Sequence, residues 1–311
     1  MVESAKKSAK QEGDEDVEGT VDQVEDRDDD EADDGEDSSR GGSKGAGSHD
    51  APVFAVEGAS VGRSFKNVIT IAVRELRSYF DSLVAYVVLG GSMLALGLFF
   101  FNDTPLSASF WKMGRAEMTH MFEFLPAWMS IIVIPLVTMR AVAEEKRSGT
   151  LELLITMPVR DAEVILGKYL AAVGMVTIML AATFLYPLLM FKVGWHLGAL
   201  DMGPVWAGYL GLFLFSLAAI ALGLMLSCIT ESQIIAFFVT AFTLTVLYAV
   251  GSFVETLHGA VGDAIAFISL QSRFSGFERG LIDTNAVIYF LSVALLCLLI
   301  AFRSLESRKW S

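Results

Sequence analysis

The stretch VWAGYLGLFLFSLAAIALGLMLSC occupies Val205–Cys228 and contains no charged residue. A helix needs about 20 consecutive apolar residues to cross the hydrocarbon core of a bilayer. This stretch is long enough, and its glycine and alanine residues allow neighbouring helices to approach closely. We therefore predict a membrane-spanning helix over these residues.

Five other segments have a similar length and composition: Leu83–Phe101, Met121–Met139, Tyr169–Phe191, Ile234–Val254 and Ala286–Phe302. Pro135 and Pro187 are expected to kink the second and third of the six spans, because proline removes a backbone donor from the helix. The sequence therefore predicts an all-α polytopic membrane protein, with six transmembrane helices in a domain over residues 63–311.

The orientation of the spans follows from the lysine and arginine residues in the short flanking segments, because positive loops stay on the cytoplasmic side. One side carries twelve of them: Arg63, Lys66, Arg74, Arg77, Arg140, Lys146, Arg147, Arg160, Lys168, Arg303, Arg308 and Lys309. The other side carries five: Lys112, Arg115, Lys192, Arg273 and Arg279. We therefore expect both termini to be cytoplasmic.

An amphipathic pattern precedes the first span. Apolar residues recur at helical spacing, namely Phe65, Val68, Ile69, Ala72, Leu76, Tyr79 and Phe80. This pattern is typical of a helix that lies in the membrane interface, and Asp81 and Ser82 offer a break before the span. The alternative is that these residues form the wet start of the first spanning helix.

Residues 1–62 form an acidic segment with few apolar residues. The first 50 residues contain 18 aspartate and glutamate residues and 6 lysine and arginine residues, a net of −12, while the whole chain has a net charge of −13. Such a composition cannot bury a core, so we expect a disordered cytoplasmic tail. Its acidity is compatible with a halophilic prokaryote as host.

Motifs for catalysis and cofactor binding are absent from the sequence. There is no GxxxxGK[ST] phosphate loop, and His49, His120, His196 and His258 show no metal-ligand spacing. We expect no catalytic residue, no bound metal or cofactor and no nucleic-acid partner. The predicted spans are nearly free of ionisable residues, which disfavours a carrier driven by an ion gradient. That class of transporter nevertheless stays open as an alternative.

Small residues repeat every four positions in the fourth predicted span, at Ala219, Gly223 and Ser227. They fall on one side of a helix, where short side chains let another helix approach closely. We interpret this stripe as a helix-packing face.

The segment between the second and third spans, from Arg140 to Lys168, is the most informative part of the chain. Its charges alternate in sign through Glu144, Glu145, Lys146 and Arg147, and an apolar run follows. This composition suits a compact hairpin that docks in a groove on a partner protein. An ordinary basic inner loop is an equally good interpretation of the periodicity alone.

Four segments, in the same order, resemble the ABC-2 type permeases. They are IAVRELRSYFDSLVAYV from Ile71, AEEKRSGTLELLITMPVRDAEVILGKYLA from Ala143, SCITESQIIAFF from Ser227 and SLQSRFSGFERGLIDTNAVIYFLSV from Ser269. The last is especially similar to the gliding-associated branch. Together the four span most of Phe65–Trp310, and the acidic tail has no counterpart in the pattern.

The resemblance implies the membrane subunit of an ATP-binding-cassette transporter in the cell membrane. The implied partners are a separate ATPase subunit, which uses ATP and Mg, a second permease subunit, identical or homologous, and membrane lipid. An ATPase-coupling element would contain Glu144, Glu145, Arg147, Gly149, Thr150 and Glu152. The alternative to transport is a membrane scaffold for a cell-surface machine, and no feature of the sequence identifies a substrate.

Overall fold

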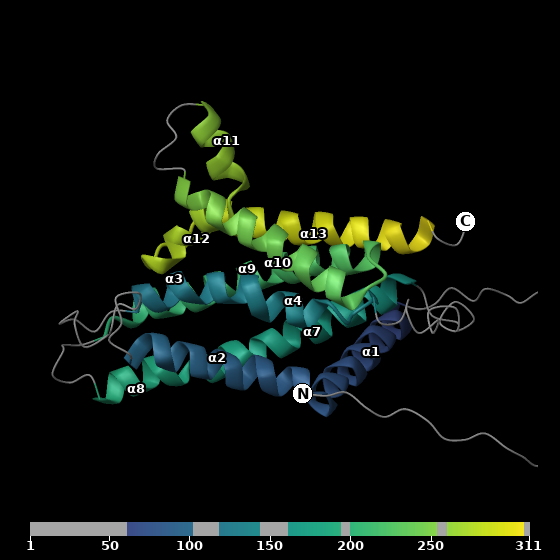
Figure 1. Cartoon of the computed structure of the whole chain (residues 1–311), viewed down its shortest axis with the longest axis horizontal. Helices are drawn as coiled ribbons and strands as arrows, with labels where there is room; N and C mark the ends of the chain where they lie inside the picture. Colours follow the sequence, from purple (N-terminus) through teal and green to yellow (C-terminus); the bar gives the residue numbers. More distant parts are fainter. Residues whose placement is uncertain (1–60, 102–117, 144–160, 194–199, 254–259, 308–311) are drawn as a thin grey trace, which may run out of the picture. The chain divides into compact units, whose positions relative to one another are not determined.

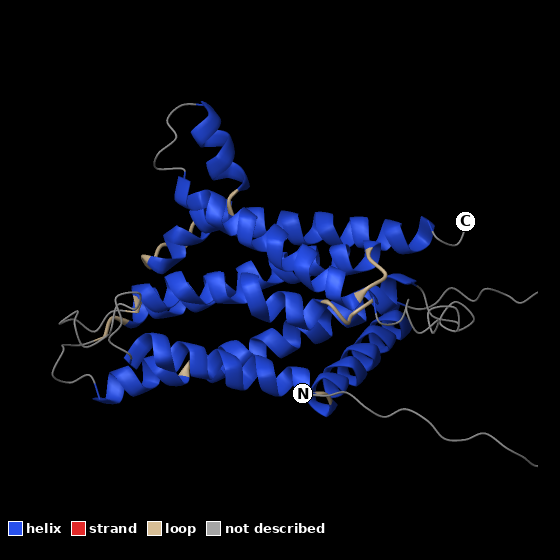
Figure 2. Cartoon of the chain, in the orientation of Figure 1, coloured by secondary structure: helices blue, strands red, loops and turns tan. Residues whose placement is uncertain are grey.

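The computed structural model describes residues 61–101, 118–143, 161–193, 200–253 and 260–307. All of them lie in the unit Val56–Ser311. Helices account for the regular structure of the described residues, and no strand occurs among them (Figure 2). The acidic tail and the residues Glu144, Glu145, Arg147, Gly149, Thr150 and Glu152 lie outside the described residues.

Five stretches of helix are long and apolar enough to cross a membrane. They are α3 with η2 and α4 (Thr119–Trp128, Met129–Val133, Ile134–Thr138), α7 with α8 (Asp161–Thr183, Leu185–Val193), α9 (Met202–Ile229), α10 with η4 (Gln233–Ala249, Val250–Phe253) and α13 (Thr284–Ser307). A sixth span is present if the bent pair α1 (Val61–Asp81) and α2 (Leu83–Phe101) counts as one. The prediction of an all-α polytopic membrane protein is confirmed.

The bend between α1 and α2 is 72° and falls at Ser82. The Ser82 amide and hydroxyl both donate to the Tyr79 carbonyl, at 3.2 and 3.0 Å, and the Ser82 hydroxyl accepts from the Val84 amide at 3.3 Å. One serine thus satisfies backbone groups of the helix that ends and of the helix that begins, as a residue at a helix boundary must. The break lies where the sequence predicted it.

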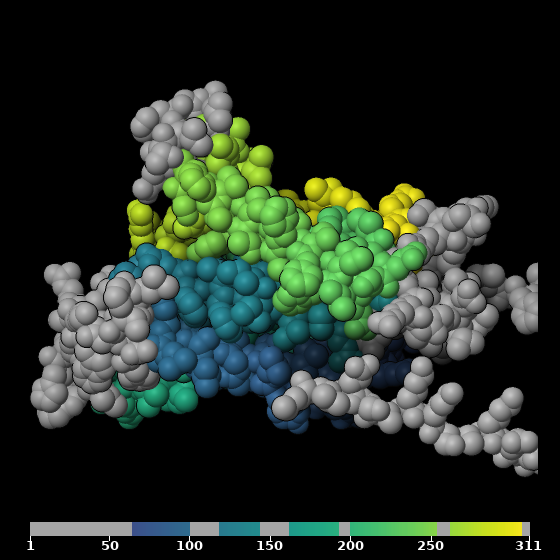
Figure 3. Space-filling model, viewed as in Figure 1, coloured from purple at the N-terminus to yellow at the C-terminus, as the bar shows by residue number. Residues whose placement is uncertain are grey.

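The central helix is α9, which packs against α13, α12 (Leu270–Glu278), α7, α10 and α4 (Figure 1). In the most apolar part of α9, 72% is buried, against 17% in α10 and 28% in α13. The helix α10 accordingly forms part of the surface, with exposed Ile234, Phe238 and Phe242 (Figure 3). In a membrane such side chains face lipid or another membrane helix.

The second span contains a π-helix, η2, directly before Pro135. The Ile134 amide donates to the Met129 carbonyl, five residues earlier, and the Ser130 hydroxyl donates to the Pro126 carbonyl at 2.8 Å. Proline has no amide to donate, so the helix locally widens instead of continuing as a regular α-helix. The third span is interrupted at Phe184, three residues before Pro187. Both interruptions lie close to prolines at which the sequence predicted kinks.

The segment between the second and third spans ends earlier than expected. The helix α7 begins at Asp161, so Lys168, which we had placed at the end of the loop, lies two turns inside a helix and is buried. Glu163 and Lys168, which precede the predicted third span Tyr169–Phe191, belong to the same helix and are both buried. Partners on α1 make their burial possible, as described below.

Candidate coupling end of the bundle

After the second span the described chain continues to Ala143, and it resumes at Asp161, where α7 begins. Residues 144–160 connect these two points. The six residues that the sequence singled out for coupling belong to this connection. What the structure describes is the frame that holds its two ends. That frame is built by α1, α4, α7 and α9.

The first end of the connection is held by α9. The Ser227 hydroxyl oxygen accepts from the Val142 amide at 3.4 Å and from the Ala143 amide at 3.3 Å. Val142 and Ala143 follow the turn after α4, and an oxygen on a neighbouring helix satisfies their buried amides. Ser227 therefore fixes the last described residues before the connection.

The other two residues of the predicted packing face lie on the same helix. A Cβ atom on Gly223 would stand 2.5 Å from Oγ1 and 3.0 Å from Cβ of Thr138, on α4. Ala219 is buried, with 1% of its surface exposed. The absence of a side chain at Gly223 is thus what lets the second and fourth spans approach so closely.

The helix α1 also contacts the end of the second span. The Tyr79 hydroxyl donates to the Val137 carbonyl at 3.0 Å, and both residues are buried. Next to this contact a small cavity of about 50 Å³ is lined by Glu75, Ser78, Tyr79, Ser82, Arg140 and Ala141. The lining is largely polar, and the cavity is large enough to hold a water molecule.

The second end of the connection is held by close packing of α1 on α7. A Cβ atom on Gly167 would stand 2.5 Å from Cγ2 of Ile71 and 3.3 Å from the Val68 carbonyl oxygen. Two turns further on, a Cβ atom on Gly174 would stand 3.6 Å from the side chain of Leu76. The two glycines give α7 a flat side on which the apolar face of α1 rests.

Two polar contacts flank this packing. The Lys168 ammonium donates to a Glu75 carboxylate oxygen at 3.2 Å, and the Lys168 side chain is only 5% exposed. The Asn67 amide donates to a carboxylate oxygen of Glu163, also buried, at 3.1 Å. Buried charges require such partners, because removing an ion from water without compensation is costly. These contacts fasten α1 to the first two turns of α7.

Sequence reasoning did not single out this set of polar residues. A usable signal was present, because Asn67, Ile71 and Glu75 recur every four residues and lie on one side of α1. Glu163 and Gly167 have the same spacing on α7. What the sequence lacked was any indication that these two sides face each other.

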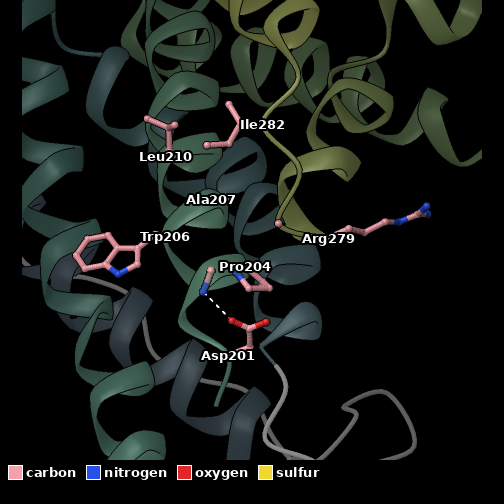
Figure 4. Close-up of a pocket in the computed structure, with 9 residues that line it drawn as sticks. Asp201, Pro204, Trp206, Ala207, Leu210, Arg279 and Ile282 are labelled. Carbon is pink, nitrogen blue, oxygen red and sulfur yellow. Dashed lines mark hydrogen bonds between the residues drawn. The ribbon is translucent and has the colours of Figure 1, made fainter. Parts of the chain in front are cut away.

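The opposite end of α9 carries a groove of about 600 Å³ between the start of the helix and the loop from Arg279 to Ile282 (Figure 4). Asp201 caps the helix by accepting from the Gly203 amide at 2.9 Å. The Arg279 side chain extends away from α9, while Trp206, Ala207 and Leu210 give the groove an apolar wall. The groove therefore brings no set of polar groups together, and we assign no chemistry to it.

No group of three or more histidine, cysteine, aspartate or glutamate residues that could hold a metal ion occurs within the described ranges. Cys228 and Cys297 are buried there and form no disulfide. The buried charged residues of α7 are paired with α1 at one end of the span, so they do not form a line of titratable groups across it. The contacts described here join helices to one another and to the two ends of the connection.

The comparison with protein families decides what this frame belongs to. The profile of the family described as ABC-2 family transporter protein matches residues 121–303, which is more than half of the 311 residues. The chain belongs to the ABC-2 transporter family. A search of the curated proteins gave no match.

As a member of this family, the protein is the membrane permease of an ABC transporter. Permeases of this family are generally not catalytic themselves. ABC-2 permeases typically work with an ABC ATPase. The match covers the second to the sixth span and includes the connection 144–160 and all of α9. The features described above as a frame thus lie mostly within the part of the permease that the family shares.

Proposed function

We propose that this permease moves an unidentified substrate across the cytoplasmic membrane with ATP hydrolysed by a separate ATPase subunit, which docks on residues 144–160. The observation that supports this assignment is the double anchoring of that connection. Ser227 holds its first end, and the ion pair between Lys168 and Glu75 holds α7 just after its second end. A force applied to such a segment is passed to the helices because both attachments are firm.

Within this proposal, Glu144, Glu145, Arg147, Gly149, Thr150 and Glu152 form the ATPase-coupling element. Charged residues at a docking surface steer the partner and fix its register. Both termini and this connection lie on the cytoplasmic side, in keeping with the distribution of lysine and arginine residues. A second permease subunit completes the translocation path, and the gliding-associated branch is the subfamily we favour.

The first test is purification of the tagged chain from native membranes in mild detergent, followed by mass spectrometry of the proteins that accompany it and an ATPase assay. We expect an ABC ATPase subunit to be recovered. Reversing two charges, with Glu144→Lys and Glu145→Lys, should release the ATPase or uncouple hydrolysis from transport.

Glu306→Lys is the matched control, because Glu306 lies near the proposed cytoplasmic end of α13 and pairs only with the exposed Arg303, at 3.3 Å. It adds the same kind of charge away from the connection. Retained ATPase binding and coupling in the double variant would contradict the coupling assignment. Absence of any ATPase under several gentle conditions would contradict the wider proposal.

A further inference from the structure

Arg273 lies against two aromatic rings at the junction of three helices. Its guanidinium carbon stands 5.1 Å from the ring centroid of Phe267, on α11 (Ala260–Ile268), and 5.5 Å from that of Tyr289, on α13. Arg273 itself belongs to α12. Aromatic faces attract a guanidinium group and orient its plane.

This clamp is held in place by backbone contacts. The Tyr289 hydroxyl donates to the Ile268 carbonyl at 2.7 Å, which fixes the ring against the end of α11. Ser269 caps α12 by accepting from the Ser272 amide at 3.3 Å. The Phe267 and Tyr289 rings also contact each other edge to face, with centroids 6.1 Å apart. The guanidinium is therefore positioned before any ligand arrives.

The charge of Arg273 is not neutralised within the described part of the chain. No carboxylate there forms an ion pair with it, and its Nε atom is buried without an acceptor. An aromatic ring stabilises a cation far less than an anionic partner does in a partly dry site. Arg273 as a whole is only partly buried, so other atoms of its charged side chain are open to a partner with acceptor oxygens.

The surroundings of the clamp indicate where that partner comes from. Phe267, Ile268 and Ile288 are 62%, 54% and 58% exposed, so apolar side chains face outward beside the charge. Tyr289 lies five residues into the last span, only about 8 Å along the helix from its start. The helix α11 runs crosswise to the spans at this level (Figure 1). A charge next to lipid-facing residues near the end of a span lies at the depth of the lipid headgroups.

We propose that Arg273, clamped by Phe267 and Tyr289, binds the phosphate of a phospholipid headgroup. Phosphate offers oxygens in the geometry that the planar guanidinium group prefers, and the acyl chains would lie against the exposed apolar residues of α11 and α13. Free inorganic phosphate has the same acceptor oxygens but gains nothing from that apolar surface. This site is independent of the proposed ATPase partner, because its residues belong to α11, α12 and α13 and not to residues 144–160.

The test measures lipid binding by native mass spectrometry of the purified full-length chain in detergent. The probes are phosphatidylglycerol, a phosphate-free galactolipid with the same acyl chains, and inorganic phosphate alone. We expect selective retention of phosphatidylglycerol. Arg273→Gln should weaken that binding roughly tenfold, since it removes charge-assisted hydrogen bonds. Arg273→Lys should recover only part of it, because lysine cannot stack or bind through two parallel hydrogen bonds.

Arg279→Gln is the matched control, because Arg279 is exposed, follows α12 directly and makes no aromatic contact among the described residues. It should leave the retention of phosphatidylglycerol unchanged. Phe267→Leu keeps an apolar side chain and provides a variant with the charge intact, and it should weaken binding less than Arg273→Gln. Equal retention of the two lipids, equal effects of the two arginine variants, or binding of inorganic phosphate as tight as that of the lipid would overturn the assignment.

Discussion

The Lys168 ammonium lies 3.2 Å from a carboxylate oxygen of Glu75, and this ion pair joins the start of the third span to the helix before the first. The lysine side chain is 5% exposed and the glutamate 31%, so water reaches only one partner. Two residues 93 positions apart in the sequence thereby hold α1 against α7. Residues 144–160 lead directly into the helix that is held in this way.

Glu75→Gln should destabilise the permease, because it removes the negative charge that faces the buried Lys168 ammonium at 3.2 Å. A fully buried broken pair costs roughly 3–5 kcal/mol, and partial exposure of Glu75 reduces this to about 1–3 kcal/mol. Thermal unfolding of the purified protein in detergent measures the effect. Arg303→Gln breaks a pair in which the side chains are 81% and 44% exposed, and it should change stability by less than about 0.5 kcal/mol. Equal losses in the two variants would show that burial of Lys168 is not the cause.

Gly223→Ala should destabilise the contact between the second and fourth spans, because the new methyl group would overlap Thr138. Overpacking of this kind costs roughly 1–3 kcal/mol. The control is Gly91→Ala, since a Cβ atom there has nothing within 4 Å. Thr138→Ala in the same chain as Gly223→Ala should restore part of the loss by making room. If Gly223→Ala melts at the same temperature as Gly91→Ala and the wild type, the close approach of these two spans does not limit stability.

Ser227→Ala should loosen the end of the second span with little effect on global stability. The variant removes the oxygen that accepts from Val142 and Ala143, so hydrogen exchange at these two amides should accelerate. Ser216→Ala is the comparison, because the Ser216 hydroxyl donates only to Phe213 in its own helix, at 2.6 Å. Unchanged exchange at the two amides in Ser227→Ala would mean that water replaces the serine without consequence.

Stability should fall as pH rises from about 4.5 to about 7, because burial, followed by the nearby Glu123 charge, raises the pKa of Glu278 from 4.5 to about 7. The folded chain binds this proton more tightly than the unfolded chain does, so the stabilisation is complete below the unfolded pKa and is lost as pH rises through the folded pKa. Glu278→Gln should flatten this part of the melting-temperature profile. Glu306→Gln, on an exposed turn of α13, should leave it unchanged. An identical slope in wild type and Glu278→Gln would assign the pH dependence to other groups.

The apolar spans and the break after Asp81 were predictable from sequence, because both depend on residues that are neighbours in the chain. The length of an uncharged segment determines whether it can cross a bilayer, whatever surrounds it. Ser82 satisfies backbone groups only two and three residues away. The resemblance to the ABC-2 type permeases is also a property of the chain alone, and the match over residues 121–303, which contains three of the four segments, confirms the family.

The extent of the third span and its charged residues could not be predicted in the same way. Lys168 is a residue type typical of loops, and its ion-pair partner Glu75 lies on another helix, which the local sequence does not reveal. Likewise, glycines occur in several spans, but a Cβ atom would meet Thr138 at Gly223 and nothing within 4 Å at Gly91. The sequence by itself determined which segments enter the membrane, since that depends on local hydrophobicity. Tertiary structure decided which residues pair, as for Lys168 with Glu75 and Arg273 with Phe267 and Tyr289, because such contacts form only when distant helices pack together.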